Sequence, residues 1–261
     1  MINSTIKNAT EKKQRLSTDP TAELKKIIEE AEIRTVFQPV IDLSNQQIVA
    51  YEAFSRGPAK SILEKPLVMF SVARESNLTL DLDCLCLKKA LDGIKKSDPK
   101  FFFFINIEAE TVFGPLWQIL RATELDFLKR IVIEFTPRLA ATDMYYLLKA
   151  ITRWKDKTFR ISIDGIGTEY HALRLITKAK PDFIKIDRSL IRNIDEKETQ
   201  RDFIGMFKTF ANSIGAELVA EGIETIGEFK TLREIGVKLG QGFLIHPPHH
   251  KPSRIVSLID F

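Results

Sequence analysis

The chain has 261 residues, of which 44% are hydrophobic and 28% are charged, as is usual for a globular protein with an ordinary core. Its 39 basic and 35 acidic residues leave a net charge of +4, and no dense Lys/Arg run with interleaved aromatic residues occurs, so we expect no binding to duplex DNA or RNA. No apolar run approaches the roughly 20 residues that span a bilayer, and the N-terminus lacks the apolar core of a signal peptide. We therefore expect no membrane association and a cytoplasmic location.

The first 32 residues form a polar extension followed by one short helix. Residues 1–18 are polar, and Asp19-Pro20 then predicts a helix start, with the acid as cap and proline at the first helical position. We assign residues 1–32 to this extension and residues 33–261 to a single barrel domain.

The barrel domain begins with two apolar runs rich in β-branched residues. These runs, 34–43 and 48–54, are joined by the turn-like segment SNQQ, which predicts an antiparallel hairpin. Cys84 and Cys86 follow in a helical segment, and because positions two apart do not face each other on a helix, we predict two free, buried thiols.

After the hairpin, strand-like and helical segments alternate to the end of the chain. Together with the hairpin they make eight strands, as expected for an α/β protein of the (β/α)8 class. The hairpin requires one strand to run against the others, so we predict a modified TIM barrel with an N-terminal antiparallel strand. The alternative is an open doubly wound sheet, against which stands the lack of a glycine-rich dinucleotide motif after any strand. The later strand-like runs are 101–108, 130–136, 159–164, 182–187, 216–224 and 240–245.

Polar side chains recur near the ends of these apolar strands. Burying isolated charges is costly, so they must converge on compensating groups, and in a barrel the carboxyl ends of the strands meet at one mouth. The residues concerned are Glu52, Asn106, Glu134, Asp164, Lys185, Glu221 and Gln241.

The chemistry of this set follows from its residue types. Carboxylates with one amide oxygen and no histidine suit Mg²⁺ or Mn²⁺ better than zinc. Enzymes that act on phosphate esters commonly use such ions. Arg56, four residues after Glu52, could hold a phosphate through its guanidinium group. His246, His249 and His250 lie among prolines and are expected to be solvated rather than metal-binding.

The motifs FQPVIDL, VAYEAFSRG, INIE, VIEFT, SIDGIGTEY, PDFIKIDRSL, VAEGIET and GQGFL occur in order between residues 35 and 248. In this order and spacing they resemble the EAL domain family, the bacterial cyclic di-GMP phosphodiesterases. The signature triplet reads Glu52-Ala53-Phe54, with phenylalanine in place of leucine.

The resemblance implies a role for each matching position. It implies that the first metal ion is held by Glu52, Asn106, Glu134 and Asp164, with Glu221 as a further ligand or base. It also implies that Lys185 contacts the metal-bound water, that Arg56 binds phosphate, and that the nucleotide and metal pocket is lined by Asp182, Glu224 and Gln241.

The sequence departs from this family at two places. Active members carry two adjacent aspartates where this chain has Asp164-Gly165, and the missing carboxylate is a ligand of the second metal ion. They also carry a glutamate where this chain has Pro137, in a region linked to dimer contacts. We therefore expect the first metal site to be retained and the second to be impaired by Gly165.

Three functions remain open from the sequence. The favoured one is a degenerate EAL domain that binds cyclic di-GMP as a receptor or adaptor, with weak or no hydrolysis. The alternatives are an active metal-dependent phosphodiesterase that yields the linear dinucleotide and a ligand-independent scaffold for a protein partner. The resemblance implies a homodimer, but the Pro137 change leaves the oligomeric state open.

Overall fold

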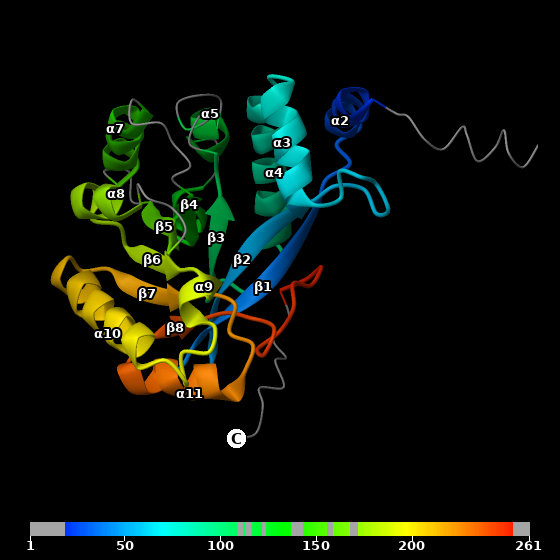
Figure 1. Ribbon diagram of the computed structural model, residues 1–261. Coiled ribbons are helices and arrows are strands. Elements are labelled where there is room, and N and C mark those ends of the chain that lie inside the picture. Colours follow the sequence, from blue (N-terminus) through cyan, green and yellow to red (C-terminus); the bar gives the residue numbers. More distant parts are fainter. Residues whose placement is uncertain are drawn as a thin grey trace, which may run out of the picture.

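The computed structural model describes residues 19–108, 112, 116–121, 124–136, 143–155, 159–167 and 172–252. Within them, eight strands close into a barrel in chain order, and helices lie around its outside (Figure 1). The strands are β1 (Arg34–Asp42), β2 (Ile48–Arg56), β3 (Phe102–Asn106), β4 (Ile131–Phe135), β5 (Arg160–Ile166), β6 (Phe183–Ile186), β7 (Glu217–Ala220) and β8 (Leu239–Gly240). The described helices are α2 (Pro20–Glu29), α3 (Pro66–Glu75), α4 (Thr79–Ile94), α5 (Leu116–Arg121), α6 (Leu125–Leu128), α7 (Asp143–Lys155), α8 (Ala172–Ala179), α9 (Arg188–Ile191), α10 (Glu198–Ser213) and α11 (Ile226–Ile235).

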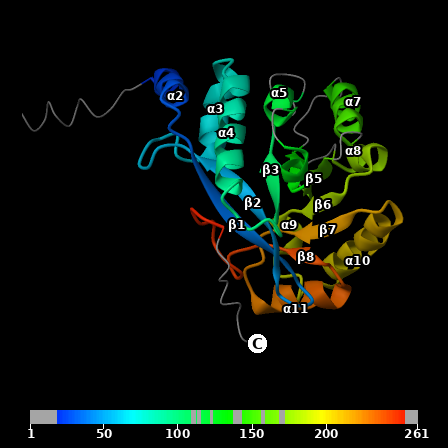
Figure 2. The ribbon, with the colours of Figure 1, turned by 180° about the vertical axis from the view of Figure 1, so that it is seen from behind.

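The predicted modified (β/α)8 barrel is confirmed, and the open sheet is not. Strand β1 pairs antiparallel with β2 on one side and with β8 on the other, while β2 to β8 run parallel to one another. The view from behind shows β1 and β2 as the long hairpin that completes the barrel (Figure 2). The hairpin register places Gln38 opposite Glu52.

The inside of the barrel is built in layers. An apolar layer is formed by Val40, Ala50, Phe104, Val132, Phe183, Val219 and Leu239. Residues two apart on a strand face the same side, so Glu134 follows Val132 on β4, and Lys185 follows Phe183 on β6, toward the carboxyl ends. A polar layer therefore lies directly above the apolar one.

The helix predicted from Asp19-Pro20 is confirmed as α2. The Asp19 side chain accepts a hydrogen bond from the backbone N–H of Thr21 at 3.0 Å, and proline occupies the first helical turn. Its buried residues Leu24 and Ile27 belong to an apolar cluster shared with α3 and α4. The proposed domain boundary after residue 32 stays a prediction, since residues 1–18 lie outside the described part of the chain.

The segment after β8 folds back over β1. The backbone N–H of Phe37 donates to the carbonyl of His249 at 2.7 Å, and the N–H of His249 donates to that of Phe37 at 2.9 Å. His249 and His250 are exposed, as expected from the sequence, whereas His246 is half-buried. The histidine segment is therefore held by its backbone while its outer side chains face solvent.

The two cysteines are free thiols on α4, as predicted. Cys86 is buried as predicted, whereas Cys84 was predicted to be buried and is only half-buried; burial raises the pKa of the Cys86 thiol to about 12. None of the helices that the structure describes is long and apolar enough to cross a membrane.

Candidate functional site

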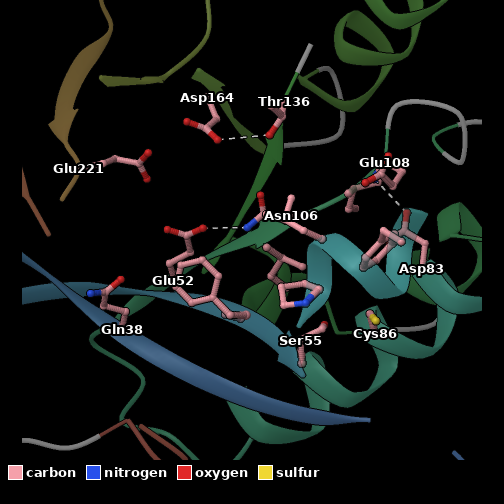
Figure 3. A pocket seen from close by; sticks show the side chains of 18 of the residues that line it. Gln38, Glu52, Ser55, Asp83, Cys86, Asn106, Glu108, Thr136, Asp164 and Glu221 are labelled. Carbon is pink, nitrogen blue, oxygen red and sulfur yellow. Dashed lines mark hydrogen bonds between the residues drawn. The ribbon is translucent and has the colours of Figure 1, made fainter. Parts of the chain in front are cut away.

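A cavity of about 410 Å³ opens at the carboxyl ends of the barrel strands and extends sideways toward α3 and α4. Its floor includes Glu52, Asn106, Glu221 and Gln241, and its outer wall includes Phe70 and further residues of α3 and α4. This volume is in the range of small-ligand pockets. Figure 3 shows side chains from β2, β3, β5 and α4 pointing into this space.

Three carboxylates meet at one buried ammonium group in the polar layer. Lys185 Nζ lies 2.5 Å from Glu52 Oε2, 2.8 Å from Glu134 Oε1 and 3.1 Å from Glu221 Oε1. The Lys185 side chain is fully buried, and those of Glu52 and Glu134 are nearly so. The structure thus brings together four of the residues predicted from the sequence, on β2, β4, β6 and immediately after β7.

Two amides complete this cluster. Gln241 Nε2 donates to Glu52 Oε2 at 2.6 Å and to Glu221 Oε1 at 2.8 Å. Asn106 Nδ2 donates to the other oxygen of Glu52 at 2.8 Å, a contact visible in Figure 3. Both amides therefore lie at the carboxylate cluster, as the sequence predicted.

The electrostatics of the cluster are those of an acid-rich site with too few cations. Burial, followed by the charge of Glu52, holds the pKa of Glu134 well above its ordinary value. Burial likewise raises the pKa of Glu221 to about 8, against the opposing effect of Lys185. Lys185 is shifted upward despite its own burial, because the charges of Glu134, Glu221 and Glu52 hold its pKa well above the ordinary value. A further cation would stabilise the ionised carboxylates of the cluster.

The donor set fits a divalent metal ion. Glu52, Glu134 and Glu221 each offer an oxygen within 4.8 Å of the others. Glu134 Oε2 is buried and finds no hydrogen-bond partner among the described residues. A buried carboxylate oxygen without a donor is costly, and a hard cation would satisfy it.

Asp164 differs from the other predicted ligands. It lies outside the carboxylate group formed by the three glutamates within the described residues. Its Oδ2 accepts a hydrogen bond from the Thr136 hydroxyl at 3.2 Å, and its Oδ1 accepts one from the Gly165 backbone N–H at 2.5 Å. In Figure 3 the side chain turns toward Thr136, although it still lines the cavity. Both of its oxygens are therefore engaged by the protein.

Gly165 has a backbone conformation that explains its residue type. Its φ of +88° lies in the left-handed region, and the β5–β6 pairing is irregular between Ile163 and Ile166. A residue with a side chain rarely adopts this φ. The chain thus lacks the second carboxylate at this position and has a backbone suited to its absence.

Asp182 and Glu224, two of the residues predicted to bind the ligand, lie away from the cavity. Asp182 precedes β6 and accepts a hydrogen bond from the N–H of Ile161, near the start of β5, at 2.8 Å. It therefore lies at the amino end of the barrel, and its prediction as a pocket residue is wrong. Glu224 does not line the cavity and pairs with Arg188 at 2.5 Å.

Arg56 ends β2 close to the cavity without lining it. Its guanidinium donates to the carbonyl of Ser55 at 2.9 Å and lies 5.6 Å from the centre of the Phe54 ring. A role in phosphate binding would require the side chain to turn. Its role thus stays a prediction. The second departure from the family pattern, Pro137, lies outside the described residues.

The structure adds residues that the sequence analysis missed. Gln38 lines the cavity and donates from Nε2 to the carbonyl of His246 at 3.1 Å. Asp83 is buried in the α4 wall and accepts from the backbone N–H of Glu108 at 3.0 Å. Gln38 carried the same signal as the predicted residues, a polar side chain within an apolar strand, whereas Asp83 is on a helix and gave none.

Comparison with known proteins agrees with this geometry. The family model for the EAL domain matches residues 21–248. The chain is 28% identical over 233 residues to a probable cyclic di-GMP phosphodiesterase, PdeB, of Escherichia coli K12, covering 86% of this chain but only 44% of that protein. The chain therefore spans less than half the length of this relative.

Solved structures share the fold. The structure resembles the EAL enzyme Bd1971 in its cAMP- and cyclic-di-GMP-bound form, with a TM-score of 0.80 and 22% identity over 99% of this chain and 72% of that one. It also resembles a standalone EAL protein from Vibrio cholerae O395 in a c-di-GMP-bound form, with a TM-score of 0.72 and 24% identity over 85% of this chain and 94% of that one. At these identities the likeness concerns the fold alone.

Proposed function

Because the chain belongs to the EAL domain family, we propose that it binds cyclic di-GMP at the mouth of its barrel and hydrolyses it weakly or not at all. It would then act as a receptor or adaptor, passing its ligand state to a protein partner. The proposal rests on a site that keeps the means to bind a phosphate ester but lacks one part of the means to cleave it.

The binding half of the proposal is supported by the cavity and its floor. The cavity is of ligand size, and Glu52, Glu134, Lys185, Glu221 and Gln241 form one connected network beneath or along it. Mg²⁺ or Mn²⁺ would be held here by Glu52, Asn106, Glu134 and Glu221. When bound, such an ion lowers the pKa of water and stabilises charge on a phosphate.

The proposal of weak hydrolysis is supported above all by the geometry at the end of β5. Gly165 offers no oxygen ligand and has a positive φ, while Asp164 gives both oxygens to Thr136 and to the Gly165 N–H. Two-metal chemistry on a phosphodiester requires ligands for both ions. Gly165, at the position of the second aspartate of the family, has no side chain to supply one for the second.

Calorimetric titration of the protein with cyclic di-GMP in Ca²⁺, Mg²⁺ and Mn²⁺, followed by chromatography of each mixture, tests both halves. We expect binding in at least one metal and recovery of the intact cyclic dinucleotide. The linear dinucleotide as the main product would make the protein an active phosphodiesterase. The absence of both heat and product in every metal would leave the scaffold function.

A further inference from the structure

Lys185 has the position of a resident cation in the polar layer. Its ammonium group has three N–H donors, and three carboxylates lie at hydrogen-bond distance, at 2.5, 2.8 and 3.1 Å. Below it, Phe104 of the apolar layer places its ring centre 5.1 Å from Nζ. The ammonium group is therefore saturated by the cluster and fully removed from solvent.

Lys185 acts on the carboxylates from beneath the cavity. Neither Lys185 nor Glu134 lines the cavity, whereas Glu52 and Glu221 do. Each glutamate gives one oxygen to the ammonium group, which leaves Glu52 Oε1 to Asn106 and leaves Glu134 Oε2 without a hydrogen-bond partner in the described structure. The lysine thus orients the three side chains while their second oxygens remain for other partners.

We propose that Lys185 is the internal counter-ion that keeps the pocket assembled when no divalent ion is bound. Three carboxylates within 4.8 Å of one another would repel strongly in a buried layer, and a single cation between them removes much of that cost. Lys185 is then a positioning residue rather than a contact to the reacting phosphate. The identity of the pocket's ligand rests on the proposed function, but the stability argument does not.

Thermal unfolding of the full chain, in EDTA and in millimolar Mn²⁺, tests this role. For the unsubstituted protein we expect Mn²⁺ to raise Tm only by the amount that binding of the ion to the folded state adds, which is less than its effect on a variant without the ammonium group. For Lys185→Met we expect Tm in EDTA to fall by roughly 10 °C, because the buried carboxylates lose their cation. Mn²⁺ should recover most of this loss by replacing the missing charge. Lys230→Met, at an exposed position of α11, is the matched control and should behave like the unsubstituted protein.

A second variant keeps the test decisive if Lys185→Met does not fold. The double variant Lys185→Met/Glu134→Gln removes the ammonium group together with one of the carboxyl groups that it offsets, so it should fold and unfold in EDTA at a higher Tm than Lys185→Met. A purely steric role for Lys185 predicts no such rescue by Glu134→Gln and a rise in Tm with Mn²⁺ no larger than that of the unsubstituted protein. Either of those results, or an unchanged Tm for Lys185→Met in EDTA, overturns the proposal.

Ligand binding separates this inference from the proposed function. If both hold, the unsubstituted protein retains cyclic di-GMP binding in EDTA, and Lys185→Met loses at least about tenfold in affinity there and regains it with Mn²⁺. If the unsubstituted protein binds no cyclic di-GMP in any condition, the proposed function fails while the Tm results still decide the role of Lys185.

Discussion

At the scale of single residues, the carboxylates of the mouth fall into two kinds. Glu134 shares one oxygen with Lys185 and leaves the other without a donor, whereas both oxygens of Asp164 are engaged by Thr136 and Gly165. The family resemblance treats both as ligands of the same ion. From these hydrogen bonds we expect Glu134 to contribute more to the binding of a divalent ion than Asp164.

The substitutions Glu134→Gln and Asp164→Asn test that difference, since each replaces a carboxyl group, which a bound cation would hold ionised, with a neutral amide at nearly constant volume. We expect Glu134→Gln to weaken Mn²⁺ binding by about tenfold or more, and Asp164→Asn to weaken it less. Calorimetric titration with Mn²⁺ measures both. Equal losses would mean that Asp164 leaves Thr136 and joins the ion.

The raised pKa of Glu221 predicts how stability varies with pH in the absence of metal. The folded protein holds a proton on Glu221 up to about pH 8, whereas the unfolded chain releases it near the ordinary value of 4.5. The folded state thus binds more protons between these values, and the free energy of unfolding should fall as pH rises through this window. The raised pKa of Glu134 acts in the same direction.

Urea unfolding in EDTA at several pH values between 5 and 8 measures this dependence. Glu221→Gln cannot titrate, so its stability should vary less with pH than that of the unsubstituted protein. Stability that increases toward pH 8 would contradict the assignment, because it would require carboxylates stabilised in their charged form.

The effect of an aspartate at position 165 depends on the backbone conformation of this loop, which the family resemblance alone does not reveal. Restoring the aspartate of active members places a side chain at φ +88°, so Gly165→Asp should lower the free energy of unfolding by about 1–2 kcal/mol. Gly165→Ala, the control without a carboxylate, should cost a similar amount. Urea unfolding measures both, and chromatography of reaction mixtures should show little gain in hydrolysis for Gly165→Asp. An undiminished stability with a large gain in linear product would show that the loop readily adopts the active arrangement.

At the scale of elements, the start of α11 positions the segment that carries Glu221. The buried carboxylate of Glu228 accepts hydrogen bonds from the backbone N–H groups of Asn193, Glu224 and Thr225 at 3.1, 2.8 and 3.1 Å. The Thr225 hydroxyl accepts one from the N–H of Glu228 at 3.1 Å, which completes a capping box. The helix terminus thereby fixes the loop that follows β7.

Glu228→Ala should therefore lower the free energy of unfolding and loosen the loop that carries Glu221. We expect a loss of about 2–3 kcal/mol in the free energy of unfolding, because three backbone donors lose a charged partner. Thr225→Ala should cost about 1 kcal/mol, as for a helix cap. Urea unfolding measures the losses, and Lys230→Ala on the exposed face of α11 is the control. A cost for Glu228→Ala no greater than for Thr225→Ala would mean that solvent replaces the carboxylate.

The arrangement of the strands and helices explains which parts of the fold and of the candidate site could be predicted from the sequence. Alternating strand and helix patterns identified the barrel, and polar residues at strand ends identified the cluster around Lys185, because parallel strands in a barrel end at one mouth. Asp182 was misassigned because it precedes its strand and so lies at the opposite end. The direction of Asp164 and of Arg56 depends on Thr136 and on Phe54, and such side-chain contacts across or along strands have no periodic signal in the sequence.

At the scale of the whole molecule, the barrel closes through its shortest strand. Strand β8 has two residues, Leu239 and Gly240, which pair with Asp42 and Ile41 of β1. The chain just beyond it is tied to the loop after β7, since Ile223 N donates to the carbonyl of Gln241 and Leu244 N donates to the carbonyl of Ile223, both at 3.0 Å. The hydrogen bonds that hold the chain at the closure of the barrel thus also place Gln241 beside Glu52 and Glu221.

Two glycines at this closure differ in what an added methyl group would meet. At Gly242 a Cβ would lie 2.1 Å from the carbonyl oxygen and 2.3 Å from the backbone nitrogen of Ile223, whereas at Gly240 it would meet side-chain carbons of Ile223 and Leu43 at 2.7 and 2.8 Å. Side chains can rotate away, but the Ile223 backbone is held by the hydrogen bonds that close the barrel. Gly242→Ala should therefore cost about 3 kcal/mol or more and Gly240→Ala about 1–2 kcal/mol.

Gly205→Ala on α10 is the control for this pair, because a Cβ there meets nothing within 4 Å and alanine favours the helix by about 0.5–1 kcal/mol. Urea unfolding should thus rank the three variants in the order Gly205→Ala, Gly240→Ala, Gly242→Ala from most to least stable. Since Gln241 lies between the two closure glycines, Gly242→Ala should also weaken Mn²⁺ binding, whereas Gly205→Ala should not. A stable Gly242→Ala protein with unchanged metal affinity would mean that the mouth is assembled independently of the way the barrel closes.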